Sequence, residues 1–257
     1  MMKIINWSLD RGINPDNVAT PIAAALGDFA TLAILQLVSS VCTSLGPISL
    51  LITLTIIIKT LPIFWKMASQ NKQTKLALRE AWFPVLGGML LSSFGGSILE
   101  RALKRFPSIA VYQPLVNGVG GNLAAIATSR LSSQMHIHIK LSSKQKLQLN
   151  LNPVHFLIGS SENAKVSRIL LSLVVPCQTF LIFILSLWRF DAIHTALIPV
   201  LIASFFQVYI LLFLVENILV IAQQNKLDPD NFGIPFLTAF GDLFGCILLL
   251  FIFEYFK

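Results

Sequence analysis

Runs of about 20 apolar residues recur along the chain, and they limit the folds that it can adopt. In an α-helix, a run of that length crosses the ~30 Å hydrocarbon core of a bilayer. The runs are too long and too continuously apolar for the alternating strands of a membrane β-barrel. We therefore predict an all-α polytopic membrane protein with about seven transmembrane helices. The candidate spans are 19–41, 46–65, 82–103, 107–132, 167–188, 192–222 and 232–256.

Composition supports this fold class and excludes others. The 257 residues are 55% hydrophobic and 12% charged, whereas soluble domains carry about 25% charged residues. A soluble globular enzyme and a disordered protein are therefore excluded. The cysteines Cys42, Cys177 and Cys246 occur singly, which is not the spacing of a disulfide framework or a zinc site. We predict no bound cofactor.

The charged residues predict how the chain lies in the membrane. The net charge of +7 is accounted for by basic residues in and beside two polar loops, 66–81 and 133–166. A basic surplus between apolar spans is typical of cytoplasmic loops rather than of a nucleic-acid surface. We therefore expect a cytoplasmic N-terminus, an outer C-terminus, a plasma-membrane location and no nucleic-acid partner. Arg101, Lys104 and Arg105 would then lie outside, partly offset by Glu100.

The first and last predicted spans share a repeated sequence. Residues 13–35 and 227–249 align without gaps at an offset of 214 and are identical at eight of 23 positions. The identities include both prolines and the Gly-Asp pair that ends in Asp28 in one copy and Asp242 in the other. Both copies run from inside to outside in the predicted topology, so this is a parallel repeat.

Ionisable residues within membrane spans are candidates for function because burying them is costly. Asp28 and Asp242 each lie about ten residues into a span, near the bilayer midplane. Their side chains are too short to reach water, and their recurrence at one depth favours a paired role over helix packing. Lys59 lies close enough to a span end to reach the interface, and Glu216 lies toward an inner end.

The fourth span, 107–132, is rich in small and polar residues. It contains Gly118, Gly120 and Gly121, flanked by Asn117 and Asn122. A local break at the glycines would free carbonyl oxygens, which membrane depth tolerates only beside protein or a water-filled cavity. The alternative is a small-residue face for helix packing. The asparagine amides favour a cavity, and oxygen donors of these kinds suit Mg²⁺ or Ca²⁺ better than zinc or copper.

Three other patterns have simpler interpretations than a functional site. His136 and His138 form an H-x-H pair that has no neighbouring acidic or cysteine cluster in sequence, so we do not predict a metal site from it. Asp228 or Asp230 is expected to cap the last helix, the alternative being an acidic, cation-attracting mouth. Two intramembrane aspartates also suggest an aspartyl protease, but the GxGD string of such enzymes is absent. A repeated helix argues against a seven-helix receptor.

Two segments carry a resemblance to a known family. PLVNGVGGNLAAIATSRLSS, from Pro114, and DPDNFGIPFLTAFGDLFG, from Asp228, resemble the second and fifth helices of the MgtE-like domain found in animal solute carrier family 41. The bacterial members share the pattern Pro-x-x-x-Gly-x-Gly-Gly-Asn and an aspartate midway along the fifth helix, matched by Asp242. WFPVLGGMLLSSFGGSILE and FLIGSSENAKVSRILL resemble the first helix and the entry to the third helix of the second such domain.

The resemblance implies a domain organisation and a function. Residues 82–257 would be a second MgtE-like five-helix domain, preceded by a connecting helix and basic linker in 42–81 and by the last helix of a first domain in 1–41. The family transports Mg²⁺ through a pore between second and fifth helices. We therefore expect a transporter of divalent cations, with Mg²⁺ as the transported ion, and not an enzyme. The alternative is a non-transporting subunit that binds or regulates a full-length relative.

Because the resemblance gives this chain one glycine-rich helix but two fifth helices, a homodimer or a full-length relative is the expected protein partner. The expected ligands of the ion or its waters are Asp28, Asp242, Asn117, Gly118, Gly121 and Asn122.

Overall fold

The computed structural model describes residues 2–141, 152, 154–159, 162–187 and 193–256, and in this part of the chain all regular structure is helical. Two short elements, α1 (Met2–Asp10) and the 3-10 turn η1 (Pro15–Asn17), precede the long helices. A four-residue helix, α6 (His155–Ile158), lies between two of the long ones. The long helices are α2 (Ala19–Leu45), α3 (Ile48–Ser69), α4 (Lys72–Arg105), α5 (Ile109–Leu141), α7 (Glu162–Ser186), α8 (Ile193–Gln224) and α9 (Pro229–Tyr255).

Each of the seven predicted spans coincides with one long helix, which confirms the all-α polytopic fold class. Six stretches of the described chain are long and apolar enough to cross a membrane, one in each long helix other than α5. α5 holds the glycines and asparagines of the fourth span, and most of its side chains between Val116 and Met135 are buried or half-buried by other helices. Its lower apolarity fits a helix that is enclosed by protein.

The predicted loop 66–81 is wrong in its extent. α3 continues to Ser69 and α4 begins at Lys72, so a turn of two residues connects them. α5 likewise extends beyond the predicted end at 132 to Leu141. Lys, Gln and Arg are good helix formers in water, so a helix continues past the point where its apolar run ends. Lys140 lies in the last turn of α5, whereas Lys144 and Lys146 fall outside the described residues.

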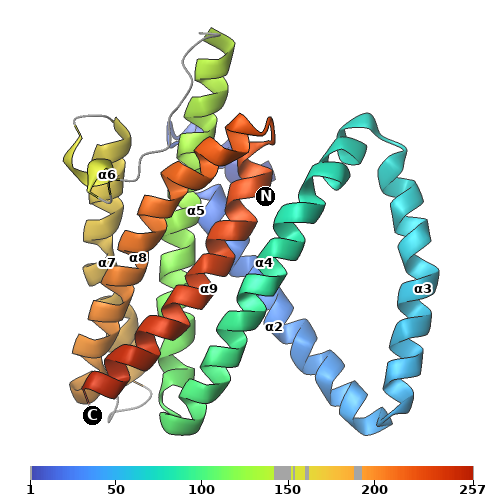
Figure 1. Cartoon of the computed structure of the whole chain (residues 1–257), viewed down its shortest axis with the longest axis horizontal. Helices are drawn as coiled ribbons and strands as arrows, with labels where there is room; N and C mark the ends of the chain where they lie inside the picture. Colours follow the sequence, from blue (N-terminus) through green and yellow to red (C-terminus); the bar gives the residue numbers. More distant parts are fainter. Residues whose placement is uncertain (1, 142–151, 153, 160–161, 188–192, 257) are drawn as a thin grey trace.

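The helices run alternately up and down, as Figure 1 shows. The N-terminus and the α3–α4 turn lie toward one end of the molecule, and the C-terminus lies at the other. α5, α7, α8 and α9 form a bundle, α4 packs along α9, and α2 crosses α5. α3 contacts α2 and α4 and stands away from the bundle.

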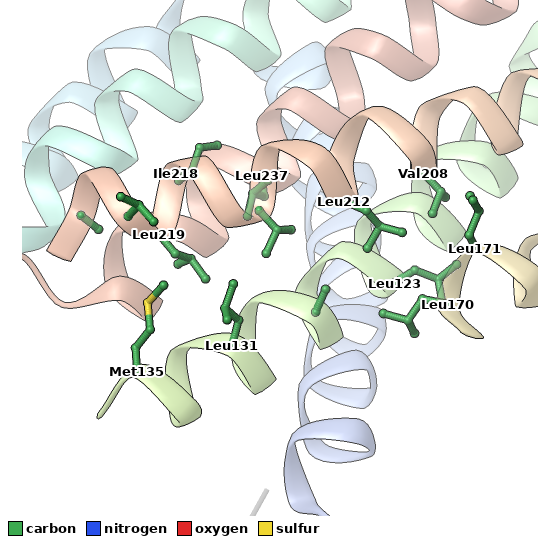
Figure 2. Close-up of a cluster of buried hydrophobic side chains, with 14 of the residues drawn as sticks. Leu123, Leu131, Met135, Leu170, Leu171, Val208, Leu212, Ile218, Leu219 and Leu237 are labelled. Carbon is green, nitrogen blue, oxygen red and sulfur yellow. The ribbon is translucent and has the colours of Figure 1, made fainter. Parts of the chain in front are cut away.

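Two clusters of buried side chains hold the bundle together. The larger one draws on α5, α7, α8 and α9, and Figure 2 shows its leucines meeting between these helices, with Met135 at one end. The smaller cluster lies toward the other end of the bundle and contains Ile109, Tyr112 and Leu249. Together these clusters fix α5 against α8 and α9, which are the helices around the candidate site.

Close packing between α4 and α9 depends on small residues. A Cβ atom added at Gly95 would lie 3.2 Å from the Cα of Leu243, and one added at Gly88 would lie 3.1 Å from the carbonyl oxygen of Pro235. Small residues let helix backbones approach in membranes, where packing replaces the hydrophobic driving force. These glycines therefore serve helix packing.

Two of the three positive charges that the predicted topology places outside form salt bridges. Lys104 Nζ lies 2.8 Å from Glu100 Oε1, one helical turn away. Arg105 pairs with Glu254 near the end of α9, so this contact also joins the two helices.

Candidate functional site

A cavity of about 460 Å³ lies between α2, α5 and α9. Its walls are formed by Asp28, Thr31, Leu32, Gln113, Pro114, Asn117, Gly118, Gly121, Asn122, Thr238 and Asp242. All six residues that the sequence singled out are among them. The cavity therefore brings together residues that are far apart in the chain.

The repeat explains why the two aspartates face the same cavity. Each copy begins with a side chain that caps its first turn: Asn14 Oδ1 accepts from the backbone N–H of Asp16 at 2.9 Å, and Asp228 Oδ1 accepts from that of Asp230 at 2.9 Å. A proline follows the cap in both copies, at the position where its missing N–H costs nothing. The predicted capping role of Asp228 is confirmed. Each aspartate therefore follows its cap by the same number of residues, and both line the same cavity, Asp28 on α2 and Asp242 on α9.

Asp242 is held by two neutral donors from other helices. Ser92 Oγ donates to Oδ2 at 3.3 Å, and Asn117 Nδ2 donates to Oδ1 at 3.1 Å. Asp28 lies close enough to Asp242 for the two carboxylates to interact electrostatically. Neither hydrogen bond neutralises the Asp242 charge, so the carboxylate remains an available ligand for a cation.

Gln207 supports this arrangement from α8, and sequence reasoning missed it. The side chain is fully buried, and its Nε2 donates to the carbonyl oxygen of Gly241 at 2.8 Å and to Asn117 Oδ1 at 3.5 Å. Gly120 and Gly245 leave room for it, because an added Cβ would lie 2.4 Å from Gln207 Oε1 or 2.7 Å from its Nε2. The sequence feature that could have identified Gln207 is a side-chain amide in the middle of a strongly apolar span.

The glycines of α5 divide into two groups. Gly118 and Gly121 line the cavity, and an added Cβ at either position would meet no heavy atom within 4 Å. Gly120 instead faces Gln207. The helix is unbroken from Ile109 to Leu141, so the local break that the glycines permitted does not form. The glycines therefore widen the cavity and admit Gln207, and they do not unwind the backbone.

The α2 wall of the cavity is open. Asp28 is exposed, as are Pro114 and Thr238 on the other walls. On the outer surface of α2, Phe29 is 73% exposed. The cavity therefore opens at the surface of the chain, and Asp28 marks its edge.

The remaining candidates lie elsewhere. Lys59 is exposed on α3, and Glu216 lines a small pocket with Arg130 and Asn163. His136, near the C-terminal end of α5, lies beside the start of α9. The side chain of His138 is outside the described residues.

Comparisons with known proteins agree with this arrangement. The MgtE family, described as a divalent cation transporter, matches residues 113–252, which include most of α5 and most of α9. Solute carrier family 41 member 2 of Xenopus laevis is 39% identical over 261 residues, which cover 97% of this chain and 46% of the relative. Member 3 of Rattus norvegicus is 39% identical, with 97% and 56% covered. Member 2 of Homo sapiens is 37% identical over 267 residues, with 99% and 46% covered.

The chain thus spans about half the length of the curated relatives that it matches. No solved structure matches it. The family match covers more than half of the chain, and the resemblance noted in its glycine-rich and Asp-bearing helices is confirmed. The chain is an integral membrane protein that belongs to the MgtE family of divalent cation transporters.

Proposed function

We propose that the chain transports divalent cations, with Mg²⁺ as the substrate, along a path lined by α5 and α9. The observation that supports this most is the cavity that collects Asp28, Asp242, Asn117 and Asn122. The family match supports the reaction class, a transport step rather than enzymatic chemistry. We extend the proposal to the division of the chain into 1–41, 42–81 and 82–257.

The donors around the cavity suit a hard dication. Its described lining contains carboxylate, amide and hydroxyl oxygens, with no cysteine or histidine. Such oxygens are the ligands that Mg²⁺ prefers, either directly or through its waters. Carbonyl oxygens of Gly118 and Gly121 retain a second lone pair within the helix and serve the same waters.

The size of the cavity fits a hydrated ion. Mg²⁺ holds six octahedral ligands and keeps several of its waters when proteins bind it. Six waters at about 30 Å³ each occupy roughly 180 Å³, and the cavity offers about 460 Å³. The cavity therefore has room for a partly hydrated Mg²⁺ whose remaining waters contact the polar walls.

The two carboxylates of the cavity attract a cation electrostatically. Asp28 and Asp242 interact electrostatically across the cavity, and two like charges in a membrane interior repel each other. A dication between them removes this repulsion and satisfies both carboxylates. In this proposal Asp28 and Asp242 are the charged ligands, and Asn117 and Asn122 bind the ion's waters.

The open α2 wall supports a second candidate function. Asp28 is exposed at the cavity edge, and an unsheltered carboxylate at membrane depth is unfavourable. A second copy or a full-length relative would cover it. In the second candidate, the chain binds such a relative and does not itself transport.

A flux assay separates the two candidates. The purified chain is reconstituted into liposomes that enclose a Mg²⁺-sensitive dye, and Mg²⁺ is added outside. We expect dye signal above that of empty liposomes, and less signal from Asp28→Asn and Asp242→Asn. A folded, membrane-inserted chain that gives no flux by itself, but changes the flux of a co-reconstituted relative, would support the accessory role.

A further inference from the structure

A second group of metal-binding side chains lies at the end of the molecule near the N-terminus. His136 belongs to α5, while Asp228 and Asp230 belong to the start of α9. Each residue offers one ligand atom, and these atoms lie within 4.8 Å of one another. None of the three lines the cavity that holds Asp28 and Asp242. The two sites are therefore distinct.

Local structure fixes the Asp228 carboxylate and the backbone of Asp230. Asp228 caps α9, and its Oδ1 accepts from the backbone N–H groups of Asp230 at 2.9 Å and Asn231 at 3.3 Å. These bonds use one oxygen of the Asp228 carboxylate, so the other lies outside the cap. The cap therefore orients the Asp228 carboxylate and fixes the backbone of Asp230 beside it, whereas the side chains of Asp230 and His136 can adjust around an ion.

Buried polar atoms beside the cluster point to a ligand. Asp230 Oδ1 is buried and, among the residues that the structure describes, has no hydrogen-bond partner by geometry. Ser132, one turn before His136 on α5, is 0% exposed, and its Oγ also has no partner by hydrogen-bond geometry. Its hydroxyl faces the Asp230 carboxylate. Buried polar groups in native proteins are nearly always paired, and a cation held between His136, Asp228 and Asp230 would give Asp230 Oδ1 a partner.

The surrounding charge favours a cation. Asp16 lies close enough to Asp230 to interact with it electrostatically, and Asp16 is the counterpart of Asp230 in the repeat. Its carboxylate accepts from Ser129 Oγ and Ser133 Oγ, each at 2.9 Å. These serines leave its negative charge in place. Asp16 thus adds negative charge beside the two carboxylates that lie next to His136.

We propose that His136, Asp228 and Asp230 form a second dication site, which prefers a transition metal such as Zn²⁺ to Mg²⁺. Imidazole nitrogen is a common zinc ligand and an unusual one for Mg²⁺. Two carboxylates and one imidazole leave a fourth position for water or for Ser132 Oγ. Since α5 and α9 also line the cavity, an ion held here bridges the two helices of the proposed path.

Binding to the purified full chain tests the proposal. Zn²⁺ is titrated calorimetrically into the chain in nanodiscs, in the presence of excess Mg²⁺. We expect one Zn²⁺ per chain, with affinity reduced about tenfold or more in His136→Gln. The matched control is His194→Gln. His194 lies at the start of α8, whereas the proposed site lies beyond the other end of that helix, so this variant should bind as the unaltered chain does. Equal affinity in His136→Gln and the unaltered chain would overturn the proposal.

A second measurement needs no folded His136 variant. His136 is exposed, so diethylpyrocarbonate should modify it in the unaltered chain, and peptide mapping by mass spectrometry follows the rate. We expect Zn²⁺, but not the same concentration of Mg²⁺, to slow modification of His136 severalfold, and Asp230→Asn to remove this protection. Unchanged modification of His136 in saturating Zn²⁺ would contradict the site.

Discussion

Asn117 on α5 and Asp242 on α9 are joined by a hydrogen bond of 3.1 Å, from the amide Nδ2 to the carboxylate Oδ1. Gln207 donates to the other end of the same amide at 3.5 Å, so the Asn117 side chain is oriented with its N–H₂ toward Asp242. The relationship links three helices at the depth of the cavity. It also means that substitutions outside the cavity can change how Asp242 is presented to an ion.

The first prediction concerns Gln207. Gln207→Leu removes the support of Asn117, and we expect Mg²⁺-dependent stabilisation to fall. The stability without Mg²⁺ should change by only about 1 kcal/mol, because the two hydrogen bonds that Gln207 donates are lost together with its buried Oε1, which has no partner among the described residues. Thermal unfolding in detergent, with and without Mg²⁺, measures both quantities.

The chain provides a matched control for this change. Gln178 on α7 is also fully buried, donates to one backbone carbonyl (Leu115, 3.1 Å) and has an unpaired Oε1. It does not line the cavity. Gln178→Leu should leave the Mg²⁺ effect intact. Equal losses in both variants would mean that Gln207 acts only through general packing.

The second prediction concerns Gly245. In Gly245→Ala the new Cβ would lie 1.9 Å from Asn117 Oδ1, so Asn117 must rotate and give up its bond to Asp242. We expect a lower unfolding temperature, by an amount equivalent to about 1 kcal/mol, and a weaker Mg²⁺ effect. Gly96→Ala is the control, because its added Cβ would meet no heavy atom within 4 Å. A Gly245→Ala variant as stable and as Mg²⁺-responsive as Gly96→Ala would refute the close contact.

The third prediction concerns orientation in the membrane. Because the basic surplus is assigned to the cytoplasm, an epitope inserted at residue 145 should bind antibody only after cells are permeabilised. A C-terminal epitope should bind antibody on intact cells, which also tests the plasma-membrane location. The reverse labelling pattern would show that the basic loops are not cytoplasmic and that the predicted orientation is wrong.

The fourth prediction concerns assembly. The exposed Asp28 wall needs a protein partner at membrane depth, so we expect the chain alone to form dimers or to be unstable, and to transport poorly as a monomer. Closed two-fold assembly is the commonest solution for identical chains. Crosslinking and mass photometry in detergent measure the state. A stable monomer with robust Mg²⁺ flux would exclude a requirement for the partner.

The fold could be predicted because bilayer thickness sets the length of each apolar run. The pairing of Asp28 with Asp242 could also be predicted, because equal positions in a parallel repeat place side chains at equal depth. The helix ends could not, since α4 begins at Lys72 and not where its apolar run starts. Hydropathy marks the edge of the membrane and not the edge of the helix.

Other parts of the site depend on which face of a helix meets which neighbour. Gln207 and Ser92 lie on helices whose facing partners are set by packing, which local sequence does not specify. The group formed by His136, Asp228 and Asp230 was missed for the same reason, because α5 meets the start of α9 only in the folded chain. Glycines indicate where a helix can break, but α5 continues through them without a break.

The most direct test of the account is the Mg²⁺ dependence of stability in Asp242→Asn. A ligand that binds only the folded chain stabilises it by about 2.7 kcal/mol at 100 times its Kd, so thermal unfolding across a Mg²⁺ series reports binding. We predict that Asp242→Asn still inserts and folds but loses most of the Mg²⁺ effect, while Asp10→Asn, at an exposed position in α1, keeps it. Undiminished Mg²⁺ stabilisation in a folded Asp242→Asn chain would contradict the account and leave Asp242 with a packing role.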